Sequence, residues 1–220
     1  MRYTPKHIFK RLFIAGLISS ILFTNTVKLE EALAEEDRRL YVDGVAVEDE
    51  VYFDFTHYRQ QDPLWGSEIM YPFNGSIELY GCAVTALAMS VEHFDIFLNP
   101  SEMNQALGLY AAPLEWEAFT AERGLKILRK DSTLDAREQL LNREYVKHET
   151  IRELAKGNPV ILGIQHNEHH TTHFVVANGY RYENGEYTVD ILDPSHNNDY
   201  QTIDDIDPAW EYMRILVIAE

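Results

Sequence analysis

The spacing of the apolar residues changes once along the chain, near Pro159, and this change restricts the fold more than any other feature. Before it, apolar side chains recur at steps of three and four residues, most clearly from Ala83 to Phe94, which predicts a helix with one buried face. Further helices are predicted in residues 99–110 and 112–125, and one or two more in residues 132–159. After it, β-branched and aromatic runs predict strands at residues 159–166, 173–182, 186–194 and 213–220. Helices followed by an antiparallel sheet indicate an α+β fold with two lobes packed around a shared cleft.

Cap and turn residues set the expected ends of these elements. Asn99 or Ser101 is suited to cap the helix of residues 99–110, and Gly124 is suited to the left-handed position after the next helix. Glu183-Asn184-Gly185 separates two strand patterns and predicts a hairpin. Residues 51–65 predict a short strand followed by a turn at Asp62-Pro63.

Residues 1–34 have the order of a secretory signal peptide. A basic start is followed by an apolar run from Leu12 to Phe23 and then by Ala32-Leu33-Ala34, a typical cleavage site. The apolar run is shorter than the roughly 20 residues that a membrane-spanning helix needs. We therefore expect cleavage after Ala34 and a secreted protein, extracellular or in the cell envelope, with a retained membrane anchor as the alternative.

The rest of the chain is expected to form one domain. Residues 35–50 are highly charged and are predicted to be an acidic lead-in or linker, which leaves residues 51–220 as the domain. The formal net charge of −17 predicts repulsion from nucleic acid and from anionic membranes. We therefore expect no nucleic-acid partner, and no stable membrane association once the signal peptide is removed.

Cys82 is the single cysteine of the chain, so it has no partner for an internal disulfide. It follows Gly81 and stands at the predicted start of the first long helix, where unpaired backbone N–H groups and the helix dipole stabilise a thiolate. Gly81 would let a substrate approach closely. These features favour a nucleophile, but free cysteines are also often small buried apolar residues, and both interpretations stay open from this residue alone.

A nucleophilic thiolate needs a base, and a base needs a residue that orients it. His173 begins one predicted strand, and Asp193 ends the next strand of the same hairpin. Neighbouring strands lie about 4.8 Å apart, so the two side chains can hydrogen-bond across the pair. Taken singly, His173 could be a surface histidine and Asp193 a turn former before Pro194.

Five segments occur together in a characteristic order. They are QQDPLW (60–65), YGCAVTALAM (80–89), GNPVILGI (157–164), HFVVANGY (173–180) and YTVDILDP (187–194). In this order they resemble the papain-fold relatives of the bacteriocin-processing, double-glycine peptidases, which form the thirty-ninth family of cysteine peptidases, and their secreted look-alikes. The resemblance extends from about Tyr58 to Pro194 and implies a papain-like cysteine peptidase fold.

The resemblance also implies roles for four residues and a class of partner. Cys82 would be the nucleophile, His173 the general base and acid, and Asp193 the residue that orients it. Gln60 would donate its side-chain amide to the oxyanion, although the adjacent Gln61 leaves an ambiguity of one residue, and outside the family match an exposed glutamine in a turn is the simpler interpretation. The implied reaction is hydrolysis of a peptide or amide bond in a peptide or protein substrate through a thioester acyl-enzyme, with no cofactor and no metal.

A cluster of histidines just before His173 supports a different function. His166, His169, His170 and His173, together with Asp193, could bind zinc or another transition metal, and the chain would then be an exported metal-binding protein. Histidines at the rim of a cleft, which titrate in solvent between pH 5 and 8, are the preferred interpretation. A further alternative is a catalytically silent module of the same fold that binds peptides.

Overall fold

The structure is a computed structural model, and it describes residues 38–42, 44–129 and 142–220. The helices are α2 (Ile77–Tyr80), α3 (Cys82–Val91), α4 (Pro100–Leu107), α5 (Trp116–Thr120) and α6 (Arg143–Ala155). The strands are β1 (Tyr41–Val42), β2 (Val45–Ala46), β3 (Glu50–Tyr52), β4 (Ile69–Met70), β5 (Gly75–Ser76), β6 (Lys126–Arg129), β7 (Val160–His166), β8 (Thr172–Glu183), β9 (Glu186–Leu192) and β10 (Trp210–Ala219). Short 3-10 turns follow α3, α4 and α5 and precede β10.

One antiparallel sheet dominates the described part of the chain. Its order is β3-β8-β7-β10-β6, and β9 pairs with β8 outside this path. In the register of β7 and β8, Ile164 pairs with His173 and Val160 with Ala177. The tip of the β8–β9 hairpin has positive φ at Asn184 and Gly185, 54° and 80°, as the sequence predicts.

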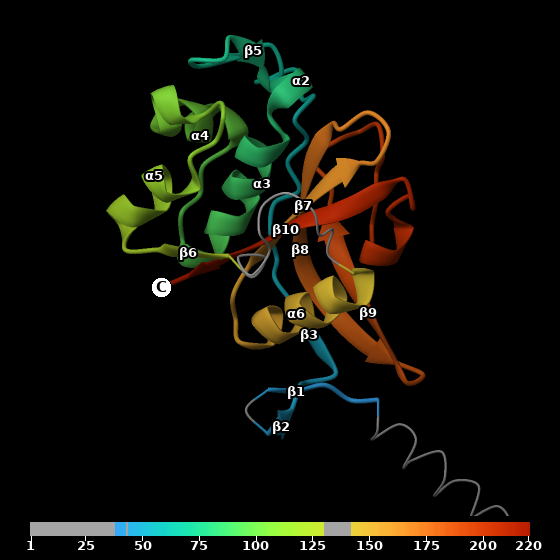
Figure 1. Ribbon diagram of the computed structural model, residues 1–220. Coiled ribbons are helices and arrows are strands. Elements are labelled where there is room, and N and C mark those ends of the chain that lie inside the picture. The colour runs from blue at the N-terminus through green and yellow to red at the C-terminus, as the bar shows by residue number, and fades with distance from the viewer. Residues whose placement is uncertain (1–37, 43, 130–141) are drawn as a thin grey trace, which may run out of the picture. The chain divides into compact units, whose positions relative to one another are not determined.

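The sheet separates two apolar cores. Alternate residues of β7, β8 and β10, such as Ile161, Val176 and Leu216, pack with α3, α4 and α5 on one face. The residues between them, such as Leu162 and Val175, pack with α6 on the other face. Figure 1 shows α3, α4 and α5 grouped on one side of the sheet and α6 apart from them. This arrangement confirms the predicted α+β fold of a helical lobe and an antiparallel sheet.

The helices begin and end mostly where the cap residues predict. Asn99 forms a capping box with Glu102 at the start of α4, and Gly124 takes the left-handed conformation, φ 73°, after the turn that follows α5. α3 departs from its predicted single buried face, because every residue from Val84 to Val91 is buried. It is therefore the central helix of its lobe, enclosed on all sides by the sheet and the other helices.

Two strands of the sheet precede the run of strands that starts near Pro159: β3 lies at the start of the short strand predicted in residues 51–65, whereas β6 was not predicted. β6 follows α5 and pairs with β10, and β3 pairs with β8 at Tyr52 and Gly179. β6 is not evident from the sequence, because it is only four residues long and largely exposed. The sheet is thus assembled from one strand before the helices, one strand between α5 and α6, and the strands that follow α6.

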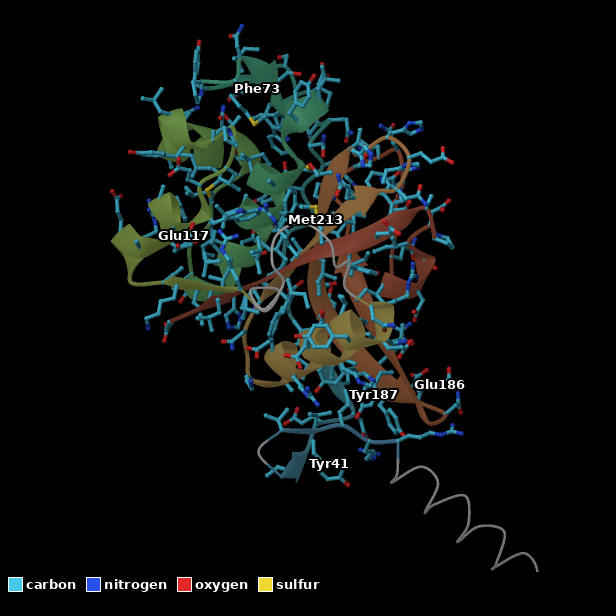
Figure 2. The ribbon with its side chains drawn as sticks, viewed as in Figure 1. Tyr41, Phe73, Glu117, Glu186, Tyr187 and Met213 are labelled. Carbon is cyan, nitrogen blue, oxygen red and sulfur yellow. The ribbon has the colours of Figure 1, made fainter. Side chains whose placement is uncertain are left out.

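The segment expected to be an acidic lead-in contains a small hairpin. β1 and β2 pair with each other, and Val47 is buried in the core beside α6. The backbone N–H of Leu40 donates to the hydroxyl of Tyr187 at 3.1 Å, and Figure 2 shows Tyr187 at the same end of the molecule as Tyr41. Residues 40–183 and 187–220 form one compact unit.

The expected signal peptide, residues 1–34, lies outside the described residues. Within the part of the chain that is described, no helix combines the length and the apolar character needed to cross a membrane.

Candidate active site

Cys82 is the first residue of α3, the position that the sequence predicts. Its thiol is free and partly exposed, whereas the helix behind it is buried. The first turn of a helix leaves backbone N–H groups without partners inside the helix, so the sulfur lies at the positive end of the helix dipole.

Gly81 has a packing role in this structure. A Cβ at this position would lie 2.5 Å from the carbonyl oxygen of Ile77 and 2.6 Å from its Cγ2. No side chain fits there, and only glycine allows α2 to pass into α3 at this angle. The glycine before Cys82 is thus accounted for by Ile77, without the close substrate approach that the sequence analysis offered.

His173 and Asp193 form a buried pair. Nε2 of His173 lies 2.7 Å from Oδ1 of Asp193, and the two residues are 7% and 0% exposed. The same Oδ1 accepts the backbone N–H of Ser195 at 2.7 Å, while Oδ2 has no hydrogen-bond partner among the described residues. Asp193 is therefore a buried carboxylate directed at the ring rather than a simple turn former, and His173 is not a surface histidine.

The His173 ring also interacts with Cys82. Burial lowers the pKa of His173, but hydrogen bonds with Asp193 and Cys82 and the charges of both residues outweigh it and raise the pKa to about 10. Because Nε2 is engaged by Asp193, Nδ1 is the ring nitrogen left for the sulfur. The structure thus joins Cys82, His173 and Asp193 in one chain of contacts, and an imidazolium beside the sulfur stabilises a thiolate.

Gln60 is buried and points toward the residues before Cys82. It is 5% exposed, and its Nε2 donates to the carbonyl oxygen of Glu78 at 2.8 Å. An amide nitrogen carries two hydrogens, so one remains for another acceptor. Gln61 bonds instead to the segment after Asp193: its Oε1 accepts the backbone N–H of His196 at 3.1 Å. Of the two neighbouring glutamines, Gln60 is the one bonded to α2, the short helix that leads into Cys82.

The Q-x-D-P-x-W segment folds into a turn around Trp65. The backbone N–H of Trp65 donates to the carbonyl of Asp62 at 3.1 Å, and its indole Nε1 donates to the carbonyl of Arg59 at 2.8 Å. The ring is 7% exposed and belongs to the core beside α3. The tryptophan therefore fixes the backbone on which Gln60 stands.

Two further polar residues, His57 and Arg59, contact the site, and the sequence did not predict a role for either. Nε2 of His57 lies 2.8 Å from the carbonyl oxygen of Asp193, and Nη1 of Arg59 donates to the same oxygen at 3.1 Å. Neither residue belongs to a motif that was singled out, and a lone arginine or histidine in a polar loop looks the same whether or not it holds another segment. Only the folded chain shows that both reach Asp193.

The histidine cluster does not converge. The rings of His166 and His169 stack with centroids 4.7 Å apart, and Nδ1 of His166 accepts the backbone N–H groups of Glu168 and His169. His170 is exposed and His173 is turned to Asp193. Within the residues that the structure describes, no three or more His, Cys, Asp or Glu side chains are grouped to hold a metal. The metal-binding alternative therefore gains no support from the fold.

Trp210 connects this loop with the site. Its ring lies 5.3 Å from that of His166 and 6.1 Å from that of His173, measured between centroids. Trp210 is therefore in ring contact with both the histidine loop and the buried His173.

The comparisons with known proteins agree with the fold. No curated protein matches the chain. A family model, that of the Peptidase_C39 like family, matches residues 52–216, which include Gln60, Cys82, His173 and Asp193. The match covers most of the chain and nearly all of the sheet, and it supports a fold of the cysteine-peptidase type. The chain therefore belongs to the Peptidase_C39 like family.

Proposed function

We propose that the protein is a secreted cysteine peptidase that hydrolyses peptide or amide bonds through Cys82, His173 and Asp193. The observation that carries the proposal is the continuous contact from Cys82 through the buried His173 ring to the Asp193 carboxylate. Families of this kind also contain inactive members, but here each position holds a side chain competent for acyl transfer. A structural cysteine would need neither an imidazole nor a buried carboxylate behind it.

The first half of the reaction forms a thioester. The thiolate of Cys82 attacks the carbonyl carbon, and the carbonyl oxygen becomes an oxyanion. The free amide hydrogen of Gln60 and the backbone N–H of Cys82 donate hydrogen bonds to this oxygen. His173 then gives its Nδ1 proton to the nitrogen of the leaving amine as the C–N bond breaks, and the acyl group stays on the sulfur.

The second half releases the acid. His173, now neutral, accepts a proton from water at Nδ1, and the resulting hydroxide attacks the thioester carbon. The C–S bond breaks, the carboxylic acid leaves, and the proton on His173 again faces the Cys82 thiolate. Asp193 keeps its hydrogen bond to Nε2 throughout, so the ring keeps the orientation that both steps need.

The secreted location rests on the order of residues 1–34 alone. Expression of the full chain in a secreting host, followed by determination of the N-terminal residue of the protein in the medium, tests it. Glu35 as the first residue supports export and cleavage; an uncleaved chain retained in the membrane fraction supports the anchor.

Alkylation of Cys82 by iodoacetamide tests the proposed function before any substrate is known. The wild type, His173→Ala and the control His148→Ala, which changes an exposed histidine of α6, are labelled from pH 5 to pH 9.5. Only the thiolate reacts, so a thiolate–imidazolium pair keeps labelling active at about pH 6 in the wild type and in the control. His173→Ala is expected to label only above about pH 8.

If all three proteins label equally and only above pH 8, the assignment of Cys82 as nucleophile is wrong, and the peptide-binding module becomes the better interpretation. If the predicted profile is found, a peptide library screened with wild type beside Cys82→Ala identifies the substrate. Cleavage must then be absent in Cys82→Ala.

A further inference from the structure

Three consecutive carbonyl groups around Asp193 are held by one short segment, His57–Gln60. His57 Nε2 and Arg59 Nη1 both donate to the carbonyl of Asp193, at 2.8 Å and 3.1 Å. The backbone N–H of Gln60 donates to the carbonyl of Pro194 at 2.8 Å, and Arg59 Nη1 donates to that of Ser195, also at 2.8 Å. A carbonyl can only accept, so His57 presents a protonated Nε2 here.

We propose that Arg59 and His57 are positioning residues, which clamp the backbone of Asp193 and thereby direct its carboxylate at His173. The inference rests on the proposed function, because it concerns the same site. It goes beyond the four residues of that proposal, since neither Arg59 nor His57 touches the sulfur or the imidazole of His173.

The clamp acts where strand geometry no longer controls the chain. β9 ends at Leu192, so Asp193 lies just outside the sheet ladder. A carboxylate on a free loop would rotate away, and a change of about 1 Å in such a contact is costly for catalysis. The bonds to the carbonyls of residues 193–195, together with the bond from the Ser195 N–H to Oδ1, fix the backbone on both sides of the carboxylate.

Arginine suits this task because its donors are arranged in a rigid plane. Arg59 uses Nη1 for the two carbonyls and Nη2 for the carboxylate of Asp199, with which it forms an ion pair. The Arg59 guanidinium lowers the pKa of Asp199 by hydrogen bonding and by charge. A lysine would keep the positive charge but present a single nitrogen on a flexible stem, which cannot reach three separate acceptors in fixed directions.

The clamp also joins the two parts of the site. Arg59 is followed directly by Gln60, whose side chain bonds to Glu78 just before the cysteine helix. The indole of Trp65 holds the carbonyl of Arg59 itself. The same segment therefore sets the oxyanion donor on one side and the Asp193 backbone on the other.

The test compares Arg59→Lys with Arg143→Lys in the full chain. Arg143 is a matched control: it donates to the carbonyls of Ile203 and Ile206, also outside the sheet, but it does not contact the site. We measure the rate of iodoacetamide labelling at pH 6, the ring titration of His173 by NMR, and Tm. The two variants are expected to lose similar stability. Arg59→Lys alone should label about tenfold more slowly and lower the titration midpoint of His173.

Two results separate the failure of the clamp from the failure of the proposed function. If the wild type labels at pH 6 and Arg59→Lys matches it in labelling and in His173 titration, Arg59 is only structural and the clamp is wrong. If the wild type itself does not label below pH 8, the proposed function has failed. His57→Gln, which retains an N–H donor, should label faster than His57→Leu, because the clamp needs the donor and not the ring; equal labelling of the two variants would remove His57 from the clamp.

Discussion

Replacing Asp193 with asparagine separates the charge of this residue from its shape. Oδ1 of Asp193 accepts from His173 and from the backbone of Ser195, and an asparagine oxygen can accept both bonds. The amide nitrogen would take the place of Oδ2, which has no hydrogen-bond partner among the described residues. Asp193→Asn therefore keeps the size and the acceptor and removes the negative charge.

The expected effect is a lower pKa of His173. Hydrogen bonds to charged groups contribute about 1.5–3 kcal/mol and neutral ones about 0.5–1.5 kcal/mol, so the loss of charge corresponds to about 1 kcal/mol or slightly more. That energy lowers the pKa by about one, from about 10 in the wild type. Asp193→Ala also removes the acceptor, so burial of the ring acts with less opposition and the expected fall is about two or more.

NMR titration of the imidazole nitrogens measures both variants, and His173→Gln identifies the signal among the nine histidines. The order wild type, Asp193→Asn, Asp193→Ala is the expected order of falling pKa. An unchanged titration in Asp193→Asn would refute the reasoning that the carboxylate charge stabilises the imidazolium.

The raised pKa of His173 also makes the stability of the folded protein depend on pH. The folded pKa of His173 lies above its ordinary value of 6.5, so the stabilisation by Asp193 is fully present below pH 6.5 and is lost as the pH rises through about 10. The difference in Tm between wild type and Asp193→Asn should accordingly be largest near pH 6 and smallest above pH 10. A difference that grows with pH would contradict the assignment.

Two further substitutions test other parts of the site. Gln60→Ala should lower kcat a hundredfold or more with the identified substrate, since an oxyanion donor contributes about 3 kcal/mol to stabilising the transition state. Its labelling by iodoacetamide should stay near wild type, because alkylation forms no oxyanion. Gln61→Ala is the control and should change kcat little. Gly81→Ala should lower the free energy of unfolding by about 1–3 kcal/mol, because its Cβ would overlap Ile77, and a denaturant titration that finds no loss would contradict the packing reason.

The main parts of the fold could be predicted because they follow apolar periodicity. β7, β8 and β9 lie within a few residues of their predicted ranges, and the α4 cap at Asn99 follows from a local capping pattern. β6 and the β1–β2 hairpin could not be predicted. Each is short and mostly exposed, so its pairing depends on a distant strand or a tight turn rather than on its own sequence.

In the candidate site, too, contacts within a local hairpin could be predicted from the sequence, whereas contacts between distant segments could not. His173 and Asp193 could be paired from the sequence because a hairpin places the two ends of neighbouring strands together. The contact of Cys82 with His173 joins a helix to a strand far along the chain, and only the order of motifs suggested it. The hydrogen bonds of Arg59 and His57 to Asp193 cross more than 130 residues to backbone carbonyls, which are the same for every amino acid.

Backbone carbonyls as acceptors explain why the clamp left no trace in the sequence pattern. A side chain that recognises another side chain requires two suitable residue types, whereas one that binds a carbonyl requires only its own. An aspartate is needed at position 193 because its carboxylate binds His173. An arginine is needed at position 59 because it binds three acceptors, the carbonyls of Asp193 and Ser195 and the carboxylate of Asp199. Substitution at Arg59 should therefore be more harmful than substitution at its exposed partner: Asp199→Asn leaves both carbonyl bonds in place and should label with iodoacetamide at pH 6 nearly as fast as the wild type.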